Sequence, residues 1–142
     1  MNKDFKKLEK NLGYSFQKKE TLVKALTHVS KSKENNEVFE FLGDSVLNLV
    51  ISQILVEKFS MDDEGTFSLM RSKLVSRTTL NRVAKKLELD SFIITGDSLA
   101  GQETPENILG NALEAIFGAV YKESGLESVS YTHLTLPTTC TV

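Results

Sequence analysis

The sequence predicts an all-α domain. Apolar residues recur at helical spacing in most segments, whereas no segment of convincing length alternates apolar and polar residues as a half-buried strand does. No internal repeat is present either. The chain has 142 residues, of which 40% are hydrophobic and 25% are charged. This length and composition are typical of one soluble globular domain with its own core.

Three helices are expected in the first part of the chain. A short amphipathic helix over residues 4–11 is followed by Gly13, a residue type that commonly ends helices. A second helix is expected over residues 19–28, with apolar side chains on one face. After a polar loop, residues 36–59 form a long and mostly apolar stretch, which predicts a helix at the centre of the core.

The second part is also expected to be helical. A carboxylate-rich turn over residues 60–65 precedes a helical pattern over 67–89, with a break near Ser76. Pro105 is a residue that the first turn of a helix accepts, and residues 107–122 after it are apolar on nearly all sides. Such a segment is expected to be buried.

Composition excludes several classes of function. The only cysteine, Cys140, excludes an intramolecular disulfide framework and a multi-cysteine zinc site. No uninterrupted apolar run reaches the ~18 residues of a membrane-spanning helix, and no secretory signal opens the chain. We therefore expect a cytoplasmic protein without membrane contact. The net charge of −2 is not that of a typical nucleic-acid binder, so an RNA or DNA function needs a specific motif.

The long apolar helix carries three carboxylates on one side. Glu37, Glu40 and Asp44 fall within about 60° of one another around a helix. A solvated polar face is the simplest interpretation of such a stripe, but the apolar flanks favour partial burial. Carboxylates brought together repel one another and are costly to desolvate, and a bound divalent cation would relieve both effects. Gly43 indicates a place where another backbone, or a partner helix, comes close.

A second polar pair lies on the late apolar helix. Asn111 and Glu114 are three residues apart and share a helix face, although an exposed polar edge would give the same pattern. If the two helices pack together, Glu40 and Asp44 join this pair in an all-oxygen site. Such a site suits Mg²⁺ or Mn²⁺ and not zinc. Glu64 adds a further acid, in a turn where exposed charge is also common.

Several stretches resemble the ribonuclease III family, the endonucleases that cut double-stranded RNA. The segment "NEVFEFLGDSVL" is similar to the family signature. It is preceded by "LGYSF" and "ALTHVS" and followed, in the family's order, by "DEG", "MRSKLVS" and "ILGNALEAIFGAVY". The resemblance covers roughly Leu8 to Gly125 and implies the family's all-α fold.

The resemblance also implies an activity and a set of site residues. It implies Mg²⁺-dependent hydrolysis of double-stranded RNA by a homodimer, with Mn²⁺ as a possible substitute, leaving 5′-phosphate and 3′-hydroxyl ends. The implied catalytic residues are Asp44 and Glu114, and the implied metal ligands are Glu40, Asp44, Asn111 and Glu114. Glu37 and Glu64 are implied as additional acids of the cleft, and Phe41 and Gly43 as dimer contacts. The candidates for RNA contacts are Thr27, His28, Arg71, Lys73 and Arg77. Asn111 stands where most members have Asp, and its carbonyl oxygen can still ligate Mg²⁺ without supplying charge.

The end of the chain departs from the family pattern. Typical bacterial members continue into a double-stranded-RNA-binding domain, and we expect this chain to be either a fragment that stops before it or a compact form that works without it. The last helix of the nuclease domain is expected to be incomplete from about Leu126. We therefore expect a nuclease domain over residues 1–128 and a non-native or disordered tail over 129–142, which contains no Lys, Arg, Asp or Glu. The missing helix should leave core surface open near Ile116 and Val120. A non-catalytic dimer that binds structured RNA is the alternative function, and the retained carboxylates argue against it.

Overall fold

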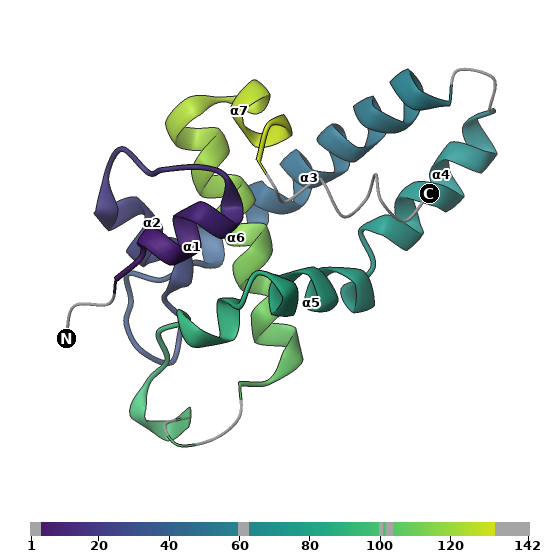
Figure 1. Ribbon diagram of the computed structural model, residues 1–142. Coiled ribbons are helices and arrows are strands. Elements are labelled where there is room, and N and C mark those ends of the chain that lie inside the picture. The colour runs from purple at the N-terminus through teal and green to yellow at the C-terminus, as the bar shows by residue number, and fades with distance from the viewer. Residues whose placement is uncertain (1–3, 60–62, 100, 102–103, 133–142) are drawn as a thin grey trace.

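The computed structural model describes residues 4–59, 63–99, 101 and 104–132 (Figure 1). Within these residues all regular structure is helical, and the only β-type pairing is a single bridge between Thr27 and Ile94. The predicted all-α class is therefore confirmed. The helices are α1 (Lys6–Leu12), α2 (Lys19–Leu26), α3 (Glu37–Lys58), α4 (Glu64–Leu74), α5 (Arg77–Lys86), α6 (Glu106–Ser124) and α7 (Leu126–Ser130), with short 3₁₀ turns at Leu89–Ser91 and Asp97–Leu99.

Most helix boundaries follow from local sequence. Gly13 ends α1 in the left-handed conformation, with φ 73°, as its position predicted. Ser76 lies at the predicted break, where its extended backbone separates α4 from α5 and its side chain accepts a hydrogen bond from the Thr79 amide. Asp63 caps α4 in the same way, by accepting from the Thr66 amide.

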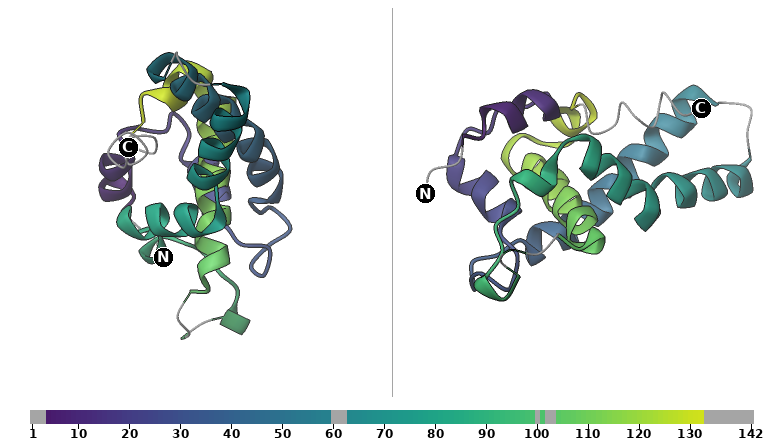
Figure 2. Two further views of the ribbon diagram at one scale, coloured as in Figure 1. Left: turned by 90° about the vertical axis from the view of Figure 1, so that its right-hand side faces the viewer. Right: turned by 60° about the horizontal axis from the view of Figure 1, so that its bottom comes forward.

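The core is built around α6. Helix α3 packs against α6 more extensively than any other pair of helices, and α5 and α2 pack on α6 as well. Figures 1 and 2 show α6 near the middle of the molecule, while the far half of α3 extends outward together with α4. The predicted burial of the late apolar helix is confirmed, since Leu113, Ile116 and Phe117 are almost completely buried.

Two glycines allow α3 and α6 to cross closely. A Cβ atom on Gly43 would lie 1.6 Å from the main-chain oxygen of Glu114, and one on Gly118 would lie 2.2 Å from that of Phe39. The predicted close approach at Gly43 is confirmed, and the approaching backbone is the chain's own α6. Gly43 is buried in this contact, whereas Phe41 is 80% exposed. The structure thus gives Gly43 a contact within its own chain, and its place at a dimer interface stays a prediction.

The predicted tail begins inside α7. Val129 is fully buried and Thr132 is 2% exposed, so these residues pack against the rest of the domain. Ile116 and Val120 are also fully buried, and the expectation of open core surface beside them is wrong. Residues 133–142, which make up most of the predicted tail, lie outside the described residues, and for them the prediction stays untested.

Helix α3 lies within the predicted range 36–59 and is strongly apolar. A window of 18 residues within its 22 has a mean hydropathy of 1.5, so length and composition alone would let the helix cross a membrane. In the structure Val46, Val50 and Ile51 of this helix belong to the core. Its apolar character is therefore explained by packing against α6.

The crossing predicts that Gly43→Ala is strongly destabilising. The added methyl group would overlap the backbone of α6, so the helices must separate, and we expect the free energy of unfolding to fall by about 3 kcal/mol or more. Gly65→Ala is the matched control, because its Cβ would find no atom closer than 3.5 Å. Urea unfolding of both variants measures the difference, and equal stabilities would contradict the role given to the crossing.

Candidate functional site

The crossing of α3 and α6 brings polar side chains together in an otherwise apolar environment. Glu114 of α6 is only 5% exposed. Burial raises the pKa of its carboxyl from 4.5 to about 8, and a hydrogen bond with Asp44 and the negative charges of Asp44 and Glu40 act in the same direction. Two helices distant in sequence therefore place three carboxylates within electrostatic reach of one another.

Glu40 shares this environment. Burial raises the pKa of its carboxyl above the ordinary value, the Arg77 guanidinium opposes that shift, and the charges of Glu37 and Asp44 reinforce it. Glu37, in the first turn of α3, is itself exposed. The acidic stripe predicted on α3 thus has exposed carboxylates at Glu37 and Asp44 and a partly buried one at Glu40, and it lies beside the buried Glu114.

Arg77 is the positive charge of the site. It is the first residue of α5, directly after the capping Ser76. Its Nη1 atom donates a hydrogen bond to Oδ1 of Asn111 and lies 3.8 Å from Oε1 of Glu114. The sequence analysis placed Arg77 among the RNA contacts and missed this pairing. Because the partners are 34 positions apart on different helices, no local spacing indicates it.

A second contact from α5 fixes the same part of α6. The Oδ1 atom of Asn81 accepts a hydrogen bond of 3.0 Å from the main-chain amide of Gly110. A Cβ atom on Gly110 would lie 2.5 Å from that oxygen, so the glycine permits the close approach. Helix α5 therefore holds α6 at Gly110 and, through Arg77, at Asn111.

Glu64 does not join the carboxylates of its own chain. It is an exposed residue in the first turn of α4, and α4 begins beyond the far end of α3. With a rise of 1.5 Å per residue, Glu40 and the end of α3 at Lys58 are separated by about 27 Å. The site within one chain therefore consists of Glu40, Asp44, Asn111 and Glu114, with Arg77 beside them.

Two of the predicted RNA contacts lie in a structured turn. Thr27 is 5% exposed and its hydroxyl donates to the Val23 carbonyl at 2.6 Å, so its side chain is not available at the surface. This corrects its assignment as an RNA contact. His28 is partly exposed, and its Nδ1 atom lies 3.1 Å from the Ser30 amide, which donates to it. Both side chains thus help to shape the connection between α2 and α3.

The remaining predicted RNA contacts lie on α4. Arg71 is partly buried and donates from Nη1 to the Ser52 hydroxyl of α3 at 2.9 Å. Its guanidinium therefore helps to join α4 to α3. Lys73 is exposed. Its role in RNA binding stays a prediction.

An apolar stripe covers the outer face of α3. Large side chains that would normally be buried are exposed here. Three of them lie within about 20° of one another around the axis of the helix. The stripe consists of Val38 (71% exposed), Phe41 (80%), Leu49 (54%) and Val56 (57%). This face points away from the contact with α6 and has no covering helix among the residues that the structure describes.

The donor atoms of the site fit a hard divalent cation. Three carboxylates and one amide carbonyl offer only oxygen, which is the ligand set that Mg²⁺ and Mn²⁺ prefer. In the conformation described, no three His, Cys, Asp or Glu side chains within the described ranges converge on one point that could hold an ion. The chemistry of the donors therefore fits the metal, and side-chain rotation is required to bring the oxygens together.

Comparison with known proteins identifies close relatives of this sequence. A family model described as "Ribonuclease-III-like" matches residues 18–136. Ribonuclease 3 of Francisella tularensis subsp. novicida is 47% identical over 118 residues, covering 83% of this chain and 51% of that protein. Ribonuclease 3 of a Sulfurovum species is 40% identical over 141 residues, covering 96% of this chain and 63% of that protein. The chain thus spans between half and two thirds of the length of these relatives.

Solved structures share the fold. A nuclease domain of ribonuclease III from Campylobacter jejuni superposes with a TM-score of 0.87 at 40% identity, covering 95% of each chain. Dicer from Pichia stipitis has a TM-score of 0.66 at 29% identity, covering 89% of this chain and 59% of that one. The arrangement of helices described above is therefore that of a known class of nuclease domains.

The pKa of Glu114 predicts how stability depends on pH. The folded chain keeps this proton up to about pH 8, whereas the unfolded chain loses it near 4.5. The free energy of unfolding should therefore fall as pH rises between these values, by a few kcal/mol. The variant Glu114→Gln has no proton to lose. Its melting temperature in metal-free buffer should match the parental protein near about pH 5 and exceed it near about pH 9.

The exposed Glu127→Gln provides the control, because Glu127 lies at the surface of α7. Its melting temperature should follow that of the parental protein across the whole range. A Glu114→Gln variant that loses stability in parallel with the parental protein would show that Glu114 does not carry the effect.

Proposed function

The chain belongs to the ribonuclease III-like family, and on that basis we propose that it is a Mg²⁺-dependent endoribonuclease that hydrolyses phosphodiester bonds of double-stranded RNA. The observation that carries the proposal is the buried Glu114 beside Asp44 and Glu40. By resemblance, the products would carry 5′-phosphate and 3′-hydroxyl ends. The same resemblance supports a cytoplasmic location.

The energetics of the site support catalysis over a purely structural role. A carboxylate removed from water is unfavourable unless a cation or several hydrogen bonds compensate it. Arg77, the cation found beside Glu114 in the described part of the chain, does not offset the effect of burial, because the pKa of Glu114 stays raised. A site of this kind gains free energy when a divalent cation arrives, and that property is useful to a metal-dependent nuclease.

Each polar residue has a role in this proposal. Glu40, Asp44 and Glu114 would hold the ion by their carboxylates and Asn111 by its carbonyl oxygen. When bound, Mg²⁺ supplies an activated water and neutralises charge on the reacting phosphate, and Mn²⁺ can substitute. Arg77 orients Asn111 and Glu114 through the contacts described above.

We also propose that the chain works as a homodimer through the apolar stripe of α3. Exposed apolar stripes of this kind mark protein–protein contacts, since their hydration is unfavourable. A dimer with twofold symmetry would place two identical stripes against each other. The nuclease domain of ribonuclease III from Campylobacter jejuni has a region involved in dimer formation.

A non-catalytic dimer that binds structured RNA is the second candidate. One observation favours it: Asn111 supplies no negative charge, and its carbonyl oxygen already accepts a hydrogen bond from Arg77. The three carboxylates weigh against it, because a binding module has no need for acids that repel both one another and the phosphates of RNA.

The proposed activity predicts that Glu114→Gln abolishes cleavage while the chain still folds. The amide has nearly the same shape but is a poorer ligand for Mg²⁺, so the cleavage rate of duplex RNA should fall at least about a hundredfold. The exposed Glu127→Gln serves again as the control and should cut at the parental rate. Cleavage by Glu114→Gln at a rate near that of the parental protein would refute the assigned role.

The proposed dimer predicts that Phe41→Glu yields monomers. A charge placed in a desolvated apolar contact is strongly unfavourable, so the dimer dissociation constant should rise about a hundredfold. Val23→Glu on α2 is the matched control, because Val23 is an exposed apolar residue outside the stripe. Sedimentation analysis over a range of concentrations measures both, and an unchanged mass for Phe41→Glu would exclude this interface.

A further inference from the structure

The guanidinium of Arg77 engages oxygen atoms that the proposed ion site needs. Its Nη1 atom donates a hydrogen bond to Oδ1 of Asn111 and lies 3.8 Å from Oε1 of Glu114. Its charge also acts on Glu40, whose ionised form it favours. The guanidinium therefore acts on three of the four residues that would hold the ion.

Arg77 reaches these oxygens by lying across Gly110. A Cβ atom on Gly110 would be 3.3 Å from Nη1 of Arg77 and 3.5 Å from its Cδ atom. Gly110 is the residue before Asn111 and lies about one turn before Glu114 on α6. The glycine leaves the arginine room to extend along α6, so the contact depends on how closely α5 and α6 pack.

The Arg77 side chain can leave this position without disturbing the core. It is 52% exposed, whereas the side chain of Glu114 is 7% exposed. Among the described residues, the hydrogen-bond and ion-pair partners of its guanidinium are Asn111 and Glu114. Asn111 carries no charge, so its contact lacks the attraction of an arginine–carboxylate pair. Rotation of the arginine into water would release both oxygens.

A guanidinium and a divalent cation are incompatible neighbours at these oxygens. Arginine offers only hydrogen-bond donors and stays protonated, so it cannot become a ligand of the ion. Two positive charges within a few ångströms of each other repel strongly in a partly buried site. The amide nitrogen of Asn111 is no ligand for a hard cation, so the oxygen that Arg77 holds is the atom this side chain has to offer.

We propose that Arg77 is a displaceable counterion of the ion site: its guanidinium holds Asn111 and Glu114 until a divalent cation displaces it. This inference rests on the proposed nuclease function and concerns the regulation of that same site. The arginine partly compensates the carboxylates, and an ion that binds must first release it. Arg77 therefore lowers the affinity of the site and raises the ion concentration at which the site fills.

The test is the affinity of the full chain for Mn²⁺ without RNA, measured from the electron paramagnetic resonance signal of free Mn²⁺. Arg77→Gln removes the competing guanidinium and its charge, so the dissociation constant should fall about tenfold, an effect typical of groups that contact metal ligands. Arg77→Lys keeps the charge but loses the planar fork, so its dissociation constant should lie between the parental value and that of Arg77→Gln. Circular dichroism verifies that each variant is folded, and Arg77→Lys retains the test if Arg77→Gln is not.

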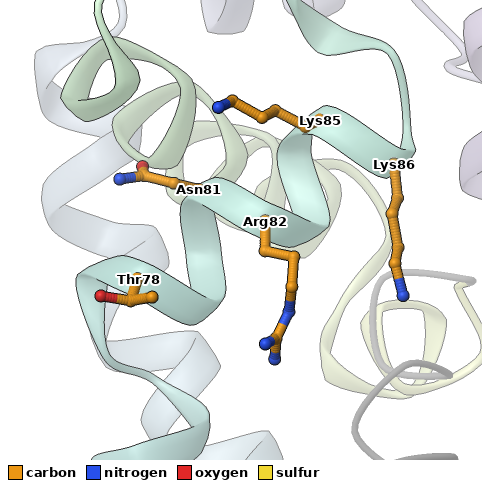
Figure 3. A pocket seen from close by; sticks show the side chains of 5 residues that line it. All are labelled: Thr78, Asn81, Arg82, Lys85 and Lys86. Atoms are coloured by element: carbon orange, nitrogen blue, oxygen red, sulfur yellow. The ribbon is translucent and has the colours of Figure 1, made fainter.

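Arg82→Gln is the matched control, because it removes the same charge from the same helix. The helix has no acid and four cations, Arg77, Arg82, Lys85 and Lys86. Arg82 is exposed and lies five positions after Arg77, on another side of the helix. Figure 3 shows its side chain leaving α5 in a different direction from Asn81, which contacts α6 at Gly110. The Mn²⁺ dissociation constant of the control should change less than about twofold, because salt screens an exposed charge that does not touch the site.

A dissociation constant of Arg77→Gln at or above the parental value would overturn the inference, and so would an equal gain in affinity in Arg82→Gln. Parental affinity of Arg77→Lys beside a gain in Arg77→Gln would indicate repulsion without displacement and would also overturn it. A parental protein that binds no Mn²⁺ would refute both this inference and the proposed metal-dependent function. One that binds Mn²⁺ as expected, with the expected gain in Arg77→Gln, but does not cut duplex RNA would refute the proposed function and leave the displacement of Arg77 supported.

Discussion

The close crossing of α3 and α6 is the constraint on which the rest of the structure depends. Gly43 and Gly118 let the two backbones approach to a distance that a methyl group would prevent. Asp44 follows Gly43 directly, and Glu114 is the residue whose main-chain oxygen Gly43 faces. The contact that joins the two central helices is therefore also the contact that gathers the carboxylates.

This arrangement lowers the stability of the fold at the point where the carboxylates meet. Glu114 is held among apolar side chains with acids beside it, which disfavours its charged form. Such local conflict with the rules of core packing is expected at functional sites and is compensated elsewhere. Here the compensation is visible in α6, where Leu113, Ile116 and Phe117 around Glu114 are almost completely buried.

Sequence reasoning recovered the features that depend on local patterns. The stops at Gly13 and Ser76 and the buried late helix follow from turn chemistry and periodicity, and the close approach at Gly43 follows from an unfavourable glycine in a helix. Features that depend on distant pairing were missed. Arg77 meets Glu114 only because α5 folds back onto α6, and Thr27 is buried where its segment pairs with Ile94.

The distribution of charge shows why composition alone misleads in this protein. A net charge of −2 suggests a weak affinity for nucleic acid, yet the acids that gather at the helix crossing and the four cations of α5 lie on adjoining parts of the surface. Charges screened over about 10 Å act locally, so a nearby polyanion would respond to the cations of α5 and not to the net charge of the chain. Under the proposed function, separating the two signs would let one face attract phosphates while its neighbour holds the divalent cation. Arg77, which belongs to α5 but contacts Glu114, lies at the boundary between them.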